Sequence, residues 1–343
     1  MHATSLDRNA LPDAARHPEH DAYDGLVTVV IAAYNPGVYL AESLRSVLEQ
    51  THRNIEIIVV DDGSTDESID RAMGLLADPR VRLIRQANQG KPAAVNHAMS
   101  IATGNFLAMH DADDVSHPTR IERQAKALRD NPDLAAVFCG HELILHGRRV
   151  APRFLGRTRE QCRRDVDRLC MPALDPTLML RRSAIGEARF DPTLRIGEGL
   201  DFILRIGEKS PMMVLGECLY SYRIHDASLT HANVQARLEA IDRVIEKTLA
   251  RRGEPTPSPR NASGSAARSA TNRDRDNNLV AHFTASVLSL KGARHYVRAI
   301  RTGMLCAGLH PLDPYYYKPI LAGLLPHALL RRFRRDVAEA RTP

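Results

Sequence analysis

The stretch LVTVVIAAYNPG, residues 26–37, decides the fold class of this 343-residue chain. Its first eight residues are apolar apart from Thr28, and most of them are β-branched. A run of this kind is typical of a strand that is buried on both faces. Asn35-Pro36-Gly37 ends the strand, and apolar residues then recur at helical spacing up to Leu48. The stretch therefore predicts a buried strand followed by a helix.

The same alternation of strand and helix continues to residue 138. Four further buried strands are predicted, at 55–60, 81–85, 106–109 and 134–138. Three helices are predicted between them, at 64–77, 92–102 and 118–130, the first opened by a capping-box pattern at Ser64 and Glu67. Such alternation predicts an α/β fold with a mostly parallel sheet covered by helices. Ligands of such sheets bind at the carboxyl ends of the strands.

Beyond residue 138 the pattern is mixed. Helices are expected at 159–170, 200–208 and 234–251, and a strand at 213–222. The domain organisation that we expect is a disordered lead-in at 1–24, one large domain at 25–250, a flexible Pro- and Ser-rich linker at 254–278 and a helical basic extension at 279–343.

The formal net charge of +6 is unevenly distributed. In residues 291–343 basic residues outnumber acidic ones by ten to three, so the rest of the chain is close to neutral. A nucleic-acid-binding body would carry its basic patch on the domain itself. The distribution therefore favours a neutral enzyme body with a basic end, and no nucleic-acid partner is expected.

The cysteines and the apolar runs of the sequence indicate the cellular compartment of the protein. The five cysteines include no C-x-x-C pair, which argues against a disulfide framework or a structural zinc site and favours a reducing cytosol. The polar residues 1–24 have no apolar core of a signal peptide. No stretch reaches the roughly 18–20 apolar residues that span a bilayer. A cytoplasmic protein is expected.

Acidic residues cluster after the predicted strands. Asp111 and Asp113 follow the strand at 106–109, and in an extended segment both side chains project to one face. Two carboxylates converging there suit Mg²⁺ or Mn²⁺, although a polar turn with helix-capping acids is the alternative. Asp61 and Asp62 either cap a helix or accept hydrogen bonds from a base or ribose. The chain contains neither G-x-G-x-x-G nor a P-loop motif, which excludes those dinucleotide and nucleotide sites.

Five segments in order carry a family resemblance. They are IAAYN (31–35), VVDDGSTD (59–66), NQGKPAAVNHAMSIATGNFLAMHDADD (88–114), FDPTLRIGEGLDFILR (190–205) and YRIHDASLT (222–230). Over residues 26–230 the chain resembles the inverting, GT-A fold glycosyltransferases of family two, of the bacterial exopolysaccharide and O-antigen type. The resemblance implies a Rossmann-like, mostly parallel sheet flanked by helices, followed here by the helical extension.

The resemblance also implies a nucleotide pocket. Three residues at the end of the first strand and directly after it would line this pocket: Ala33, Tyr34 and Asn35. Asp61 or Asp62 would read the base or the ribose, and Lys91 and Asn96 would lie near the nucleotide sugar.

A metal site is implied by the same resemblance. Asp111 and Asp113 would hold Mn²⁺ or Mg²⁺ on the diphosphate. Arg223 and His225 would contact the diphosphate or the metal from the other side. A lone histidine is more often a packing residue, but the setting YRIHDAS favours a ligand role for His225.

The position of the catalytic base departs from the family pattern. The family places an aspartate where this chain has Gly199. Either Glu198 or Asp201 would then deprotonate the acceptor hydroxyl, with Glu198 ahead. As the alternative, Asp201 pairs with Arg205 one helical turn later.

The end of the chain offers two interpretations. Residues 319–335 combine leucines at helical spacing with four arginines. This pattern fits peripheral contact with an anionic membrane surface, on the cytoplasmic face of an inner membrane, or a core-packing helix with a solvated basic end. If this segment contacts a membrane, we expect a sugar acceptor that is linked to polyprenyl diphosphate.

Three functions are weighed. The leading one is a metal-dependent glycosyltransferase that moves a sugar from a UDP-linked donor to a growing, lipid-linked glycan. Gly199 keeps open a non-catalytic nucleotide-sugar-binding subunit of a polysaccharide assembly complex. A metal-dependent nucleotidyltransferase ranks lowest, because IAAYNPG supplies no basic group for a triphosphate.

Overall fold

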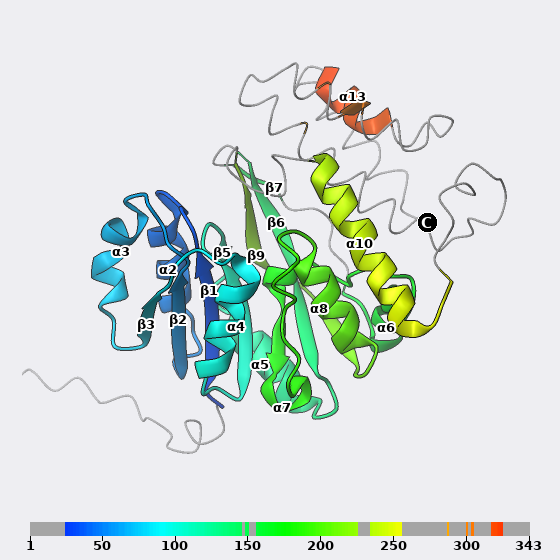
Figure 1. The fold of residues 1–343 in the computed structure, drawn as a ribbon. Coiled ribbons are helices and arrows are strands. Elements are labelled where there is room, and N and C mark those ends of the chain that lie inside the picture. The colour runs from blue at the N-terminus through cyan, green and yellow to red at the C-terminus, as the bar shows by residue number, and fades with distance from the viewer. Residues whose placement is uncertain are drawn as a thin grey trace, which may run out of the picture.

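The computed structural model describes residues 25–145, 148–150, 156–225 and 234–255, with short pieces at 287, 300, 303–304 and 317–324. One mixed sheet forms the centre, and helices cover both of its faces (Figure 1). The strands are β1 Val27–Ala33, β2 Ile55–Asp61, β3 Val81–Arg85, β4 Phe106–Asp111, β5 Val115–Ser116, β6 Ala136–Leu145, β7 Arg148–Val150, β8 Met179–Arg181 and β9 Met212–Ile224. The helices are α2 Tyr39–Leu48, α3 Ser68–Leu76, α4 Lys91–Ile101, α5 Arg120–Asp130, α6 Arg159–Asp167, the 3₁₀ turn η1 Asp175–Thr177, α7 Arg182–Ile185, α8 Glu198–Gly207, α10 Val234–Arg252 and α13 Lys318–Leu324.

The sheet has a parallel half and a mixed half. Its strand order is β3-β2-β1-β4-β8-β6-β9-β5, with β7 paired to β6. β3, β2, β1 and β4 are parallel, whereas β8 is antiparallel to both β4 and β6. In the parallel half Ala33 lies opposite Asp61, and Ala32 lies opposite Asp111. The carboxyl ends of β1, β2 and β4 therefore meet at one edge, as the sequence predicts.

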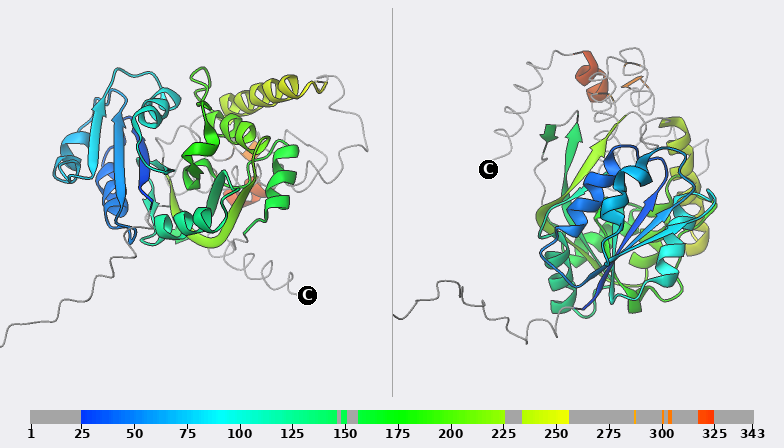
Figure 2. Two further views of the ribbon diagram at one scale, coloured as in Figure 1. Left: turned by 90° about the horizontal axis from the view of Figure 1, so that it is seen from below. Right: turned by 90° about the vertical axis from the view of Figure 1, so that its left-hand side faces the viewer.

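Alternate side chains of each central strand enter two different cores. Val29 and Ile31 of β1 pack with α2, α3 and α5, whereas Val30 packs on the other face with α4 and α8. Burial of each such side chain is worth about 1.5–3 kcal/mol. This two-sided burial explains why the strands read as continuous apolar runs. The sheet curls, and α10 lies at the far end of the molecule from α3 (Figures 1 and 2).

The predicted capping box at Ser64 and Glu67 is wrong. α3 begins at Ser68, and Asp66 Oδ1 accepts a hydrogen bond from the Ser68 backbone N–H at 3.1 Å. Ser64 has another function, because its Oγ accepts the backbone N–H of Asn35 at 3.0 Å. The segment that was expected to open the helix instead forms a turn beside the end of β1.

The second half of the sheet holds elements that the sequence did not predict. β6 extends to Leu145, beyond the predicted 134–138, because it pairs along most of its length with β9. The three-residue elements η1 and β8 follow each other and lie against β4. Runs this short carry almost no periodicity.

The ends of the chain are described only in part. The predicted lead-in at 1–24, nearly all of the predicted linker and most of the extension, including 325–335, lie outside the described residues. Within the part that is described, α13 begins the segment 319–335, and no helix is long and apolar enough to cross a membrane.

Candidate active site

A turn after β1 forms one wall of the site. Asn35 has a left-handed backbone with φ of 48°, a conformation that asparagine tolerates better than most residues. Its Oδ1 accepts the backbone N–H groups of Thr65 and Asp66 at 2.8 and 3.3 Å. Ala33 is buried at the strand end, while Tyr34 is 53% exposed. The predicted nucleotide-lining residues thus form a shelf that the turn after β2 holds in place.

Asp61 and Asp62 have different partners. Both oxygens of Asp62 are engaged: Oδ1 accepts from Gln86 Nε2 and the Gln89 N–H, and Oδ2 accepts from the Gly90 N–H at 2.8 Å. Asp61 Oδ1 accepts the Ser64 N–H at 2.8 Å, but its Oδ2 has Arg85 Nε only at 3.9 Å. Asp62 therefore holds the loop that leads into α4, and Asp61 keeps the oxygen that is better placed for a ligand.

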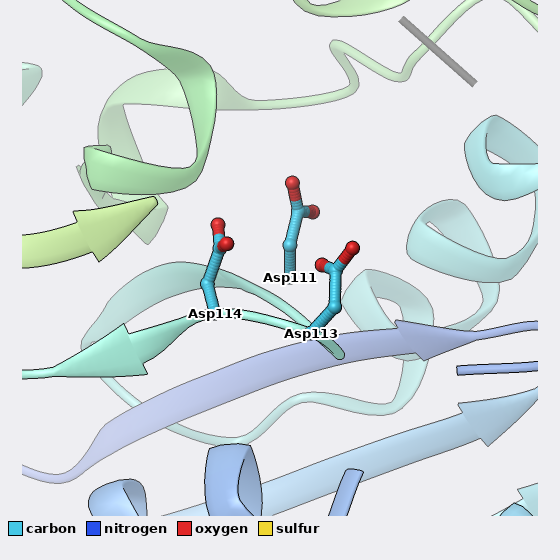
Figure 3. Close-up of side chains that lie close together, drawn as sticks. All are labelled: Asp111, Asp113 and Asp114. Atoms are coloured by element: carbon cyan, nitrogen blue, oxygen red, sulfur yellow. The ribbon is translucent and has the colours of Figure 1, made fainter. Parts of the chain in front are cut away.

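Three carboxylates converge after β4. The ligand oxygens of Asp111, Asp113 and Asp114 all lie within 4.8 Å of one another, and Figure 3 shows the side chains pointing to the same side of the loop. Burial and the charges of Asp113 and Asp111 raise the pKa of Asp114 well above its usual value. Burial also raises the pKa of Asp111, although Lys91 opposes this. Concentrated negative charge of this kind favours a bound cation.

Residues at the end of strand β9 and directly after it contact this cluster. His225 Nε2 lies 2.8 Å from Asp113 Oδ2, so the structure brings the two predicted metal residues together. The Arg223 backbone N–H donates to Asp114 Oδ1, and its Nε donates to the Asp113 carbonyl, both at 2.7 Å. Arg223 Nη2 pairs with Glu42 at 2.7 Å. The guanidinium therefore holds the loop in place and shares its charge with Glu42, and its predicted contact with the diphosphate or the metal stays a prediction.

The donor set of this cluster fits a hard divalent cation. Carboxylate oxygens are the ligands that Mg²⁺ and Mn²⁺ prefer, and an imidazole nitrogen stands beside them. Asp111 and Asp113 can hold such an ion as predicted, and Asp114 is a third candidate that the sequence analysis did not single out.

Lys91 links this cluster to a second group of carboxylates. Its Nζ lies 2.7 Å from Asp111 Oδ1, 3.5 Å from Asp175 Oδ2 and 3.9 Å from Glu198 Oε1. Burial alone would lower the pKa of Lys91, but the three negative charges raise it well above its usual value. The ammonium group is therefore permanently charged. Gly90, with φ of 94°, and Pro92 in the first helical turn fix the start of α4 that carries it.

Glu198 is the first residue of α8. It follows Gly197, whose φ of 85° lets the chain turn sharply into the helix. Burial raises the pKa of Glu198 to about 7, with Lys91 acting in the opposite direction and Asp175 and Asp111 adding to the rise. Its carboxyl group lies 3.9 Å from Lys91 Nζ, and its role as the base stays a prediction.

Two predicted residues lie outside the cluster. Asp201 pairs with Arg205 at 2.8 Å and lies 3.8 Å from Arg251, so its buried carboxylate joins α8 to α10. The pairing with Arg205 that its spacing predicts is confirmed, and the role of base stays a prediction. Asn96 uses its amide on the backbone of Phe190, accepting the N–H and donating to the carbonyl, each at 2.8 Å. Its predicted place near the nucleotide sugar stays a prediction.

Asp175 is the residue that sequence reasoning missed. It opens η1, between the loop that follows α6 and strand β8. The only signal was an Asp-Pro-Thr turn placed directly before the apolar run LML at 178–180.

Comparison with known proteins agrees with this geometry. Residues 28–186 match the model of the family Glycosyl transferase family 2. An uncharacterised glycosyltransferase of Rickettsia typhi is 28% identical over 225 residues, which cover 62% of this chain and 68% of that protein. One from Rickettsia conorii is 28% identical over 207 residues, which cover 60% of this chain but only 34% of the relative. These matches show that residues 28–186 are similar to glycosyltransferase family 2 and that the relatives are named glycosyltransferases.

Solved structures share the fold. TarS 1–349 of S. aureus, in complex with UDP-GlcNAc, has a TM-score of 0.54 at 16% identity and covers 90% of this chain and 92% of that one. The mannosyltransferase PcManGT of Pyrobaculum calidifontis, in complex with GDP-Man and Mn²⁺, has a TM-score of 0.55 at 19% identity and covers 88% and 86%. The chain has the α/β fold of the GT-A glycosyltransferases, which confirms the predicted fold class.

Proposed function

We propose that the protein is a metal-dependent, inverting glycosyltransferase. It would move a sugar from a nucleoside-diphosphate donor to a growing lipid-linked glycan. The donor that we propose is UDP-linked. The observation that carries the proposal is the joining of two groups by one lysine. Lys91 contacts the Asp111 cluster on one side and Glu198 with Asp175 on the other.

The two groups suit the two ends of a transfer reaction. The nucleotide would lie against the shelf at residues 33–35, with its base near Asp61. Mn²⁺ or Mg²⁺, held by Asp111 and Asp113, would neutralise charge on the departing diphosphate. TarS with UDP-GlcNAc and PcManGT with GDP-Man and Mn²⁺ support a nucleotide-sugar donor and a divalent cation by analogy.

The residues of the chain supply the remaining chemistry. Lys91 would place a positive charge beside the departing diphosphate. Charge-assisted hydrogen bonds from its ammonium group would stabilise the negative charge that develops there. A carboxylate beside Lys91 would take the proton of the acceptor hydroxyl, a contribution of about 10²–10⁴-fold in rate. Attack from the face opposite the leaving diphosphate inverts the anomeric centre.

The acceptor is proposed from the chemistry of the chain end. Leucines and arginines at 319–335 suit contact with an anionic membrane surface, where a polyprenyl-diphosphate-linked glycan would be presented. Synthesis of exopolysaccharide or another cell-envelope polymer on the cytoplasmic face of the membrane is the setting that this implies.

One experiment tests the proposed function. The purified protein is incubated with Mn²⁺, a membrane lipid extract and a panel of UDP- and GDP-linked sugars, and release of free nucleotide is followed. We expect lipid-dependent release from one donor, abolished by EDTA. Metal-dependent nucleotide binding without release from any donor would instead support the non-catalytic subunit that Gly199 kept open.

A further inference from the structure

We propose that Asp175 is the general base of this transferase, replacing the carboxylate that the chain lacks at position 199. The assignment rests on the proposed function. It concerns a residue on η1, whereas the resemblance pointed only to the start of α8.

The space that a side chain at 199 would fill is occupied by Asp175. A Cβ atom at Gly199 would lie 2.8 Å from each of three Asp175 atoms, Cβ, Cγ and Oδ2. Real Cβ atoms essentially never approach this closely. The two positions therefore compete for one volume, and the carboxylate enters it from η1 instead of from α8.

Asp175 is held where the reaction needs it. Its Oδ2 lies 3.5 Å from Lys91 Nζ, which in turn contacts Asp111 at 2.7 Å. The next residue, Pro176, is fixed by the buried guanidinium of Arg120, whose Nη2 donates to the Pro176 carbonyl at 2.8 Å. The Asp175 carbonyl accepts the Leu178 N–H at 3.0 Å. These bonds fix the backbone from which the carboxylate extends.

The two carboxylates of α8 are less accessible to an acceptor. The side chain of Asp175 is 28% exposed, against 12% for Glu198. Asp201 is buried against Arg205 and Arg251. A base must reach the proton that it removes, so geometry favours Asp175.

The step balances without a further reactant. The acceptor oxygen forms a bond to the anomeric carbon as its proton passes to an oxygen of Asp175. The bond from the anomeric carbon to the diphosphate oxygen breaks, and the nucleoside diphosphate leaves with the electron pair. Lys91 keeps its proton and offsets charge on both sides of the reacting carbon.

The test compares Asp175→Asn with Glu198→Gln, using the donor and lipid extract that give release with the wild-type protein. Asp175→Asn should lower turnover by about 10²-fold or more while binding of the Mn²⁺–nucleotide changes less than about threefold. A merely positioning role would move nucleotide binding and turnover together. Retained turnover in Asp175→Asn, with loss in Glu198→Gln, would assign the base to Glu198 and overturn the proposal.

A relocation variant gives an independent check. Asp175→Gly combined with Gly199→Asp removes the Cβ clash and returns a carboxylate to the same volume from α8. We expect this double variant to recover about tenfold or more of the turnover lost in Asp175→Gly alone. No recovery by a folded, nucleotide-binding double variant would contradict the shared-volume argument. A wild-type protein that releases nucleotide from no donor would overturn the proposed function itself.

Discussion

Asp113 connects two parts of the site, because it lies in the loop after β4 and its side chain contacts His225, the residue that follows β9. His225 also lies against the ring of Tyr39, with centroids 4.9 Å apart. A histidine that orients a ligating carboxylate tunes the metal even when it does not bind the ion itself.

We therefore expect His225→Ala to raise the Mn²⁺ concentration needed for half-maximal nucleotide binding by roughly tenfold. The fold should be retained, because the ring is at the edge of the site. Titration calorimetry with Mn²⁺ and UDP or GDP measures the change. His117→Ala removes an exposed histidine whose ring contacts Thr119, and it serves as the matched control. Equal Mn²⁺ dependence in both variants would contradict the assignment.

At the scale of elements, Arg120 joins α5 to β4 and η1. It is fully buried, and Nη2 donates to the carbonyls of Met109 and Pro176, both at 2.8 Å. Its charge also lies 4.7 Å from the ring of Tyr220. One buried side chain thus links β4, which ends at the candidate metal ligand Asp111, with the turn that carries Asp175.

Arg120→Met should lower the free energy of unfolding by about 3 kcal/mol, because two buried carbonyls lose their donor. Arg123→Met is the control on the same helix. The side chain of Arg123 is 52% exposed, and its ion pair with Glu217 is long at 3.6 Å. Its loss should therefore lower the free energy of unfolding by about 0.5 kcal/mol or less. Urea unfolding of both variants measures the difference, and similar values would show that Arg120 does not act as a structural link.

The loop before α8 is tied to α10 by a pH-dependent ion pair. Asp191 accepts hydrogen bonds from the Lys247 ammonium group at 2.6 Å and from the hydroxyl and N–H of Thr193. These bonds lower the pKa of Asp191 to about 2, although burial acts in the opposite direction. Since the folded pKa is below the unfolded value of about 4, the stabilisation is complete above pH 4. It is lost as the pH falls towards 2.

Asp191→Asn should therefore reduce stability at pH 7 by about 0.5–1 kcal/mol, and the difference from wild type should shrink between pH 4 and pH 2. Urea unfolding at several pH values follows it. A difference that stays constant down to pH 2 would show that ionisation of Asp191 does not stabilise the fold.

Sequence reasoning reached the elements with long apolar runs or clear helical periodicity. The long apolar strands β1, β2 and β4 fix both the parallel half of the sheet and the position of Asp111 and Asp113 at its edge. Asp175 was out of reach because η1 and β8 have three residues each and are placed by tertiary contacts such as that of Arg120. For Asp201 the sequence left both a role as base and a pairing with Arg205 open, because periodicity does not tell which face of α8 meets α10.

At the scale of the whole molecule, charge separates the chain into a near-neutral body and a basic end. Four arginines, at 331, 332, 334 and 335, lie outside the described residues and follow the leucines of 321–330. Each basic residue near an anionic membrane surface contributes about 1 kcal/mol.

Replacing these four arginines with serine should abolish salt-sensitive co-sedimentation with vesicles of anionic lipid, because most of the electrostatic attraction is removed. Vesicles of neutral lipid are the control, and the wild-type protein should bind them weakly. Nucleotide release with a water-soluble acceptor should be unaffected. Equal vesicle binding by both proteins would refute membrane contact through this segment.

The central claim is that the carboxylates after β4 form a metal-dependent nucleotide site. Titration calorimetry of UDP and GDP, with Mn²⁺ or with EDTA, against the wild-type protein and Asp113→Asn tests it most directly. We predict that one nucleotide binds the wild-type protein with Mn²⁺, and that binding weakens about tenfold or more in EDTA or in Asp113→Asn. Equal affinity in all three conditions, or no binding of either nucleotide, would contradict the account.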